Sequence, residues 1–193
     1  NECSGPYRQG GGICVFNSVR TFSLTIENTI ISNNLSVMGG GIALLNCVGS
    51  LNKNTIVNNS SQSGGYGGGI WLDNSNPIIT NCTIANNTSS IGGGISFSGD
   101  NYAADELSIV NSILWGNSPE QIKLLGLSKH LEVVYSTVMN DSIGIEDPQN
   151  GSDIVVWEEN ISVDPLFINS DSSDYNLSEN SPCIDLGTAY YVS

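Results

Sequence analysis

The stretch N-C-T-I-A-N-N-T-S-S-I-G-G-G-I, from Asn81 to Ile95, decides the fold because its two markers recur along the chain. The first marker, G-G-G-I, begins at Gly10, Gly39, Gly67 and Gly92, in steps of 29, 28 and 25 residues. The second marker, an apolar pair between asparagines, recurs in phase with it over 28–34, 53–59, 81–87 and 111–117. Two markers in register over four copies indicate a repeat of twenty-odd residues.

Each repeat predicts short β-strands. The residues after each glycine triplet are I-C-V, I-A-L, I-W-L and I-S-F, in which apolar positions alternate with a variable one. The inward positions are Ile13/Val15, Ile42/Leu44, Ile70/Leu72 and Ile95/Phe97, and the outward column is Cys14, Ala43, Trp71 and Ser96. A unit this short cannot bury its apolar face alone, so neighbouring units must stack.

The composition selects one kind of stack. The 22 glycines, the many asparagines and the β-branched residues disfavour helical repeats, and the spacing of leucine-rich repeats is absent. The sequence therefore predicts an all-β, parallel β-helix of about five coils. Each coil has three short strands, and each strand pairs with its equivalent one coil away at about 4.8 Å.

The asparagines mark the corners of the coils. Equivalent side chains lie above one another there, and asparagine tolerates the left-handed backbone that sharp corners require. We predict a ladder of amide hydrogen bonds with a second column beside it and a third after the glycine strands. The ladder is Asn33, Asn58 and Asn86; the column beside it is Asn34, Asn59, Asn87 and Asn117; the third column is Asn17, Asn46 and Asn74.

Length and charge limit the function. The 193 residues, 39% of them hydrophobic, predict a single domain with a lead-in (1–9), repeat coils (10–140) and an irregular acidic C-terminal cap (141–193). The net charge is −14, and only five residues are Lys or Arg. We therefore expect no nucleic-acid partner and no binding to anionic lipid. No apolar run approaches the roughly 20 residues that span a bilayer, so no membrane insertion is expected.

The repeat and the tail resemble a known family. G-G-G-I followed by I-x-N-N is similar to the repeats of secreted bacterial right-handed β-helix surface proteins, including the polymorphic outer-membrane-protein passengers. The tail, N-I-S-V-D-P-L-F-I-N (160–169) and D-Y-N-L-S-E-N-S-P-C-I-D-L-G (174–187), resembles their DPLF … SPxIDxG ending. The resemblance implies a right-handed β-helix at the cell surface or outside the cell. It implies no particular reaction.

Residues with catalytic chemistry are sparse. In the repeats the acids Glu27 and Asp73 fall on different strands of different coils, and the carboxylate clusters of polysaccharide hydrolases are missing. The bases Arg20 and Lys53 have no neighbouring carboxylates in sequence. The only histidine, His130, has no nucleophile motif around it and is expected to be an ordinary surface residue. The sequence leaves enzymatic activity undecided and leans against it.

Metal and disulfide signals are weak as well. The five cysteines, Cys3, Cys14, Cys47, Cys82 and Cys183, have no C-x-x-C spacing, which argues against zinc. Either they are buried small hydrophobes, or one pair such as Cys3 and Cys14 forms a disulfide. The insertion G-D-N-Y-A-A-D-E-L brings together Asp100, Asp105 and Glu106, weak calcium candidates without a D-x-D-x-D loop, so a solvated loop is favoured. No other cofactor is expected.

Two kinds of surface position remain. Trp71 in the outward column is a candidate glycan contact, because an exposed ring stacks on sugars; packing beneath the Tyr66 loop and a subunit contact are the alternatives. Among the Asn-x-Ser/Thr sequences, Asn140, Asn150 and Asn176 fall in expected loops and are the candidate glycosylation sites.

The sequence supports two classes of function. The favoured one is a non-catalytic extracellular rod, a surface, matrix or fibre subunit that binds glycans or copies of itself, because unpaired coil ends are exposed sheet edges. The alternative is a carbohydrate-active enzyme or glycan-binding module that uses an outer face. A groove lined by two carboxylates and a base favours the enzyme, and a flat face favours the rod.

Overall fold

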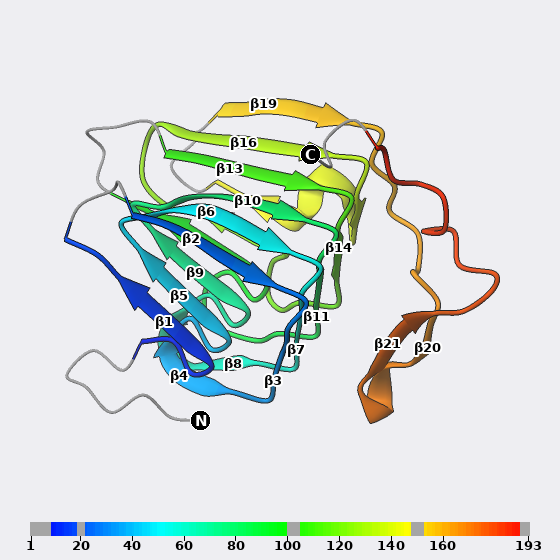
Figure 1. Ribbon diagram of the computed structural model, residues 1–193, viewed down its shortest axis with the longest axis horizontal. Coiled ribbons are helices and arrows are strands. Elements are labelled where there is room, and N and C mark those ends of the chain that lie inside the picture. The colour runs from blue at the N-terminus through cyan, green and yellow to red at the C-terminus, as the bar shows by residue number, and fades with distance from the viewer. Residues whose placement is uncertain (1–8, 19–21, 100–104, 148–152, 190–193) are drawn as a thin grey trace.

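The computed structural model shows a parallel β-helix, described here for residues 9–18, 22–99, 105–147 and 153–189 (Figure 1). The first sheet contains β1 (Ile13–Phe16), β5 (Ile42–Leu45), β9 (Ile70–Asp73), β12 (Ile95–Ser98), β15 (Ile122–Leu124) and β18 (Ile145–Glu146). The second contains β2 (Phe22–Glu27), β6 (Cys47–Asn52), β10 (Asn76–Thr80), β13 (Asp105–Val110), β16 (Lys129–Val134) and β19 (Asp153–Glu158). The third contains β3 (Ile30–Ser32), β7 (Thr55–Val57), β11 (Thr83–Ala85), β14 (Ile113–Trp115) and β17 (Thr137–Val138).

Shorter elements complete each winding and the tail. A fourth, two-stranded sheet of β4 (Leu35–Met38) and β8 (Ser60–Tyr66) leads from the third sheet back to the first. The 3-10 helices are η1 (Asp141–Gly144) and η2 (Ser170–Ser172), and β20 (Phe167–Asn169) pairs with β21 (Asp174–Leu177). Every strand pairing within the described residues is parallel except β20 with β21. The predicted all-β parallel solenoid of about five coils is confirmed.

The core consists of apolar columns along the axis of the solenoid. Equivalent side chains face one another across successive coils, as Ile42, Ile70 and Ile95 do in the first sheet, and all three have no exposed surface. Ile79 of the second sheet and Ile84 of the third contribute to the same cluster. Burying one such side chain contributes about 1.5–3 kcal/mol, so the stacked columns are the main stabilising term.

The glycine triplets form the corner before the first sheet. The first glycine of a triplet takes a left-handed backbone, with φ of 62° at both Gly39 and Gly67. At the second position space is the limit, because a Cβ on Gly40 would lie 2.4 Å from the carbonyl oxygen of Ser60. The triplet therefore lets β4 and β8 fold back closely along the first sheet.

The amide ladder runs through the asparagine next to the one expected. Asn59 donates from Nδ2 to Asn87 Oδ1 over 3.0 Å, and the same bond joins Asn34 to Asn59 and Asn87 to Asn117. Each amide oxygen also accepts from a backbone N–H, as Asn87 Oδ1 does from Asn59 over 2.9 Å. Gln121 closes the ladder, since its Oε1 accepts from Asn117 Nδ2 over 2.8 Å.

The ladder predicted through Asn33, Asn58 and Asn86 is therefore wrong. These residues take the left-handed conformation, with φ of 56°, 56° and 53°, and this backbone makes the corner and turns the following asparagine inward. The third predicted column differs too, because Asn46 Nδ2 donates to the backbone oxygen of Asn17 over 3.0 Å instead of to an amide. Asn46 and Asn74 are left-handed corner residues, with φ of 55° and 51°.

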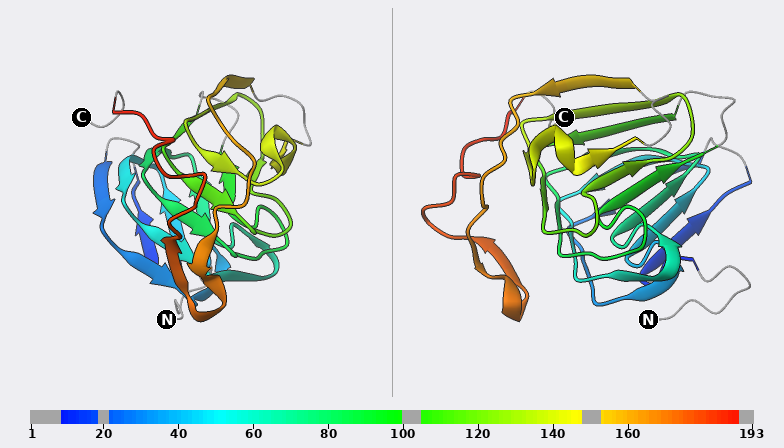
Figure 2. Two further views of the ribbon diagram at one scale, coloured as in Figure 1. Left: turned by 90° about the vertical axis from the view of Figure 1, so that its right-hand side faces the viewer. Right: turned by 180° about the vertical axis from the view of Figure 1, so that it is seen from behind.

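The C-terminal segment does not form the expected cap. β18 and β19 extend the first and second sheets, and the bridge between Thr137 and Ile161 continues the third, so the winding passes residue 140. The chain then turns back, and the β20–β21 hairpin lies beside the third sheet (Figures 1 and 2). This tail, 162–189, fastens the flank of the solenoid because its Tyr175 hydroxyl bonds to Asn58 and Asn86.

Candidate functional site

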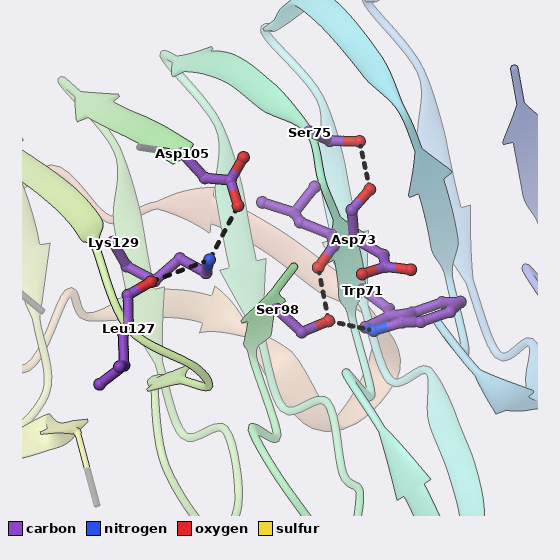
Figure 3. A network of polar contacts seen from close by, with 8 residues as sticks. Trp71, Asp73, Ser75, Ser98, Asp105, Leu127 and Lys129 are labelled. Atoms are coloured by element: carbon purple, nitrogen blue, oxygen red, sulfur yellow. Dashed lines mark hydrogen bonds and ion pairs between the residues drawn. The ribbon is translucent and has the colours of Figure 1, made fainter. Parts of the chain in front are cut away.

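The outer face of the first sheet is largely covered by the chain itself. Met38 and Tyr66, which precede the glycine triplets, pack over Ala43 and Trp71. Trp71 is only 7% exposed, and its Nε1–H donates to Ser98 Oγ over 3.0 Å (Figure 3). Of the three readings of Trp71, the structure thus favours packing beneath the Tyr66 segment. The ring lines a cavity of about 330 Å³, but it is not an exposed platform for a sugar.

The outer face of the third sheet is covered by the tail. Tyr175 is 8% exposed and packs in one cluster with Val57 and Ala85, two outward residues of the third sheet. Its ring meets Phe167 edge to face, with 5.1 Å between centroids. Two of the three long sheets therefore have outer faces occupied by other segments of the chain.

The outer face of the second sheet is the accessible one. Its outward side chains are exposed or half-buried, and they change along the axis from hydroxyl and amide groups to acids. In coil order they are Ser23, Thr25, Ser50, Asn52, Asn76, Ile78, Glu106, Ser108, His130 and Glu132. The uncharged end and the acidic end share one continuous face (Figure 1).

A groove lies at the acidic end of this face. Its volume is about 320 Å³, and the side chains that line it come from β13, β16 and β19. The register sets Glu106 opposite His130 and Ser108 opposite Glu132. Ser108 Oγ donates to Glu132 Oε2 over 2.6 Å, which holds that carboxylate in place. The floor also includes Leu107, Leu131 and Val156.

The strand geometry fixes the spacing of the two carboxylates. A strand separation of about 4.8 Å and a rise of about 3.3 Å per residue put the Cα atoms of Glu106 and Glu132 roughly 8 Å apart. His130 lies between them, one coil from Glu106 and two residues from Glu132. Two acids and an imidazole on one groove can accept and donate hydrogen bonds to a polyhydroxylated ligand.

Sequence reasoning had separated these residues. His130 was expected to be an ordinary surface residue, Glu106 to belong to a loop, and Glu132 was not singled out. The signal that joins them is a step of 24 residues, from Glu106 to His130 and from Ser108 to Glu132, which is the local coil length. Asn111 and Tyr135, left-handed corner residues of the same two coils, show the same step.

The calcium candidates lie apart from one another. Asp105 and Glu106 belong to β13 and not to a solvated loop, and they face opposite sides of the strand. The Asp105 carboxylate lies inside the solenoid against Lys129, while Glu106 faces the groove. Asp100 lies outside the described residues. Within the described part of the chain, no three metal-ligating side chains are grouped.

A second acidic cluster lies at the far end of the outward column of the first sheet. Lys123 Nζ contacts Glu146 Oε2 over 2.5 Å and Glu120 Oε1 over 3.6 Å. Burial, and then the hydrogen bond with Glu146, raises the pKa of Glu120. The hydrogen bond from Glu120, and then that from Lys123, lowers the pKa of Glu146. The repeat pattern did not single out these residues because they fall where the glycine triplet is lost.

The other sequence candidates are dispersed. Glu27 and Asp73 lie on β2 and β9 in different coils, Lys53 is an exposed corner residue, and Arg20 lies outside the described residues. Asn140 and Asn176 are exposed, and the Asn176 amide donates to Asp174 over 2.7 Å. Asn150 and Cys3 lie outside the described residues. Cys47 and Cys82 are buried, as the small-hydrophobe reading expects, and Cys183 is half-buried.

Comparisons with known proteins identify the family. Searches of curated proteins and of solved structures gave no match. No helix in the described part of the chain is long and apolar enough to cross a membrane. A family model described as "Right handed beta helix region" matches residues 1–138, more than half of the chain, and it agrees with the parallel sheets and with the expected handedness. The chain therefore belongs to the right-handed β-helix family.

Proposed function

We propose that this chain is a non-catalytic, extracellular rod-like module that binds glycans on the outer face of its second sheet. The fold is consistent with a structural or carbohydrate-related role. The observation that carries the proposal is the accessible second-sheet face, on which hydroxyl, amide and carboxylate side chains border the groove of Glu106, His130 and Glu132. The similarity of the tail to secreted surface proteins supports an extracellular location.

The chemistry of the face limits the glycan. Sugar hydroxyls donate to carboxylates and accept from Ser, Thr and Asn, and the apolar Ile78 and Val156 can contact the C–H faces of a ring. The chain carries a net charge of −14, which repels uronic-acid and sulfated polymers. The ligand class is therefore a neutral or amino-sugar polysaccharide.

The binding test compares glycan classes and two matched variants. Calorimetry with neutral, amino-sugar and uronic-acid oligosaccharides should show binding of the first two classes only. Glu132→Gln should lower the affinity about tenfold, since a hydrogen bond to a charged group contributes about 1.5–3 kcal/mol. Glu27→Gln, on the same face but at the far end, should leave the affinity unchanged. Binding of uronic-acid polymers alone, or equal effects of both variants, would contradict the proposal.

The end strands support self-assembly as a second property of the rod. Among the described strands, β2 and β19 stand at opposite ends of the second sheet, and each has a single paired neighbour. Such edges offer unpaired backbone groups to another chain. Sedimentation velocity across a concentration series should show growth of the particle, and a monomer at all concentrations would remove assembly from the proposal.

A second candidate function is glycoside hydrolysis in the same groove. Two carboxylates on opposite sides of a sugar, with a separation of about 6.5–9.5 Å between carboxyl groups, are the arrangement of inverting glycosidases. The Glu106–Glu132 spacing is what favours it. Release of reducing ends from a bound polysaccharide, abolished in Glu132→Gln while binding persists, would select the enzyme over the rod.

A further inference from the structure

A lysine and an aspartate contact each other inside the solenoid, away from the groove. Lys129 of β16 and Asp105 of β13 are register partners, and Lys129 Nζ lies 2.8 Å from Asp105 Oδ2 (Figure 3). Neither side chain has exposed surface. Lys129 Nζ also donates to the backbone oxygen of Leu127 over 3.3 Å and lies 5.9 Å from the centre of the Phe97 ring.

Burial changes which form of this pair is favoured. Desolvating an ammonium and a carboxylate costs several kcal/mol per ion, so transfer of one proton along the hydrogen bond relieves both charges at once. The result is a neutral amine in contact with a neutral carboxylic acid. These two groups are the reactants of amide formation, held in contact with water excluded.

We propose that Lys129 and Asp105 condense to an intramolecular amide that cross-links β16 to β13. The lone pair of neutral Nζ forms the bond to Asp105 Cγ, and the bond from Cγ to its hydroxyl oxygen breaks. That oxygen leaves with the proton released from nitrogen as one water molecule. An ammonium and a carboxylate thus become an amide and water, with no oxidant, reductant or other co-reactant.

Proximity supplies the driving force. The two side chains extend from directly opposed positions on adjacent strands, about 4.8 Å apart, so the reacting groups are held together by the fold. Effective molarities of groups oriented in this way reach about 10⁵–10⁸ M, which can overcome the preference for hydrolysis in bulk water. The product also removes two charges from the interior and leaves an amide.

The chain contains a comparison pair. Lys123 and Glu146 are in contact too, but the Glu146 side chain is 47% exposed. Water solvates both charges there and competes with the amine, so this pair stays ionic. The expected cross-link count is therefore one.

Denaturing mass spectrometry of the intact folded protein tests the proposal directly. The expected mass is that of the sequence less one water molecule, and the full sequence mass would overturn the proposal. Loss of two waters would show that exposure does not discriminate between the pairs, and it would overturn the argument from burial.

Trypsin locates the bond. After denaturation an unlinked chain is cut after Lys123 and Lys129, releasing 124–129 as a free peptide. The cross-link blocks cleavage at Lys129 and joins 54–123 to 124–193 in one branched species, which is one water lighter than the sum of its parts. Free 124–129 in full yield would overturn the proposal, whatever the intact mass.

Two variants complete the test. Lys129→Arg should restore the full mass, because a guanidinium is too weak a nucleophile to form the amide. Lys123→Arg, one coil position away on the first sheet, should keep the deficit of one water. If Lys129→Arg does not fold, the tryptic map of the unaltered protein still decides the outcome.

Discussion

The Tyr175 hydroxyl donates to Asn58 Oδ1 over 2.9 Å, which joins the tail to a corner of the solenoid 117 residues earlier. The same oxygen accepts from Asn86 Nδ2 over 2.9 Å, one coil further on. The corner asparagines that do not enter the ladder thus hold the tail against the flank.

Replacing Tyr175 should release the tail and leave the coils intact. Tyr175→Phe keeps the ring contact with Phe167 but loses both hydrogen bonds, so the tail should lose about 1–2 kcal/mol of local stability. Hydrogen exchange should speed up in β20 and β21 and not in β7 or β11. Tyr175→Ala, which also loses the ring, should have the larger effect, and equal protection in both variants would argue against this role.

The two asparagines of a corner should differ sharply in their effect on stability. Asn87→Ala removes the acceptor of the Asn59 amide and the donor to the Ile56 oxygen, so the free energy of unfolding should fall by about 3 kcal/mol. Asn33→Gly is the control, since glycine adopts a φ of 56° without strain. Its expected effect in urea unfolding is within about 0.5 kcal/mol. Similar losses in both would mean that the ladder is not the stabilising column.

The Glu120 carboxyl predicts a pH dependence. Its pKa is raised in the folded state, chiefly by burial, so the folded chain binds this proton more tightly than the unfolded chain does. The contribution of Glu120 is therefore full below the unfolded pKa, near about 4.3, and is lost as the pH rises through the folded pKa. Glu146, with its lowered pKa, works in the opposite sense, and its contribution is lost as the pH falls.

Glu120→Gln should isolate the first of these terms. The variant keeps an oxygen acceptor for the Gly92 N–H but carries no charge that burial disfavours. Stability at about pH 7 should rise by a few tenths of a kcal/mol. The decline in stability between about pH 4 and pH 7 should flatten. Urea unfolding at several pH values measures both, with the exposed Glu158→Gln as control; an unchanged slope would contradict the assignment.

The buried Cys82 thiol should be inert while the chain is folded. Burial raises its pKa to about 11, and the side chain is only 1% exposed. At about pH 8 the thiolate is then about one part in a thousand, and the reagent cannot reach it. Iodoacetamide should label Cys82 only after unfolding, whereas the half-buried Cys183 should be labelled earlier. Equal labelling of both in the folded chain would contradict the burial.

The repeat predicted the solenoid but not the roles within a corner. Asn58 and Asn59 recur with the same period, so spacing alone cannot tell which one takes the left-handed backbone and which one points inward. The position of Trp71 depended on Met38 and Tyr66, which the glycine corner folds back over the first sheet. A period of two along the strand predicts the direction of a side chain, but it does not predict what covers it.

The candidate groove and the tail required information that the repeat lacks. Glu106, His130 and Glu132 are brought together by a coil of 24 residues, shorter than the glycine-marked ones and without their markers. The contact of Tyr175 with Asn58 joins a non-repeating segment to a repeating one, so no periodicity announces it. Asp105 and Lys129 share the same 24-residue step, which became readable only once the register was known.

The amide ladder has one end that can be lengthened and one that cannot. Asn59 gives its amide to the winding after it and takes one from the winding before it, so a copied winding inserted next to it would find complementary neighbours on both sides. At Asn117 the partner is Gln121 from the same winding, and the series stops. A gene of this kind can grow by tandem duplication upstream of Gln121, while anything added beyond it must be stabilised by other means.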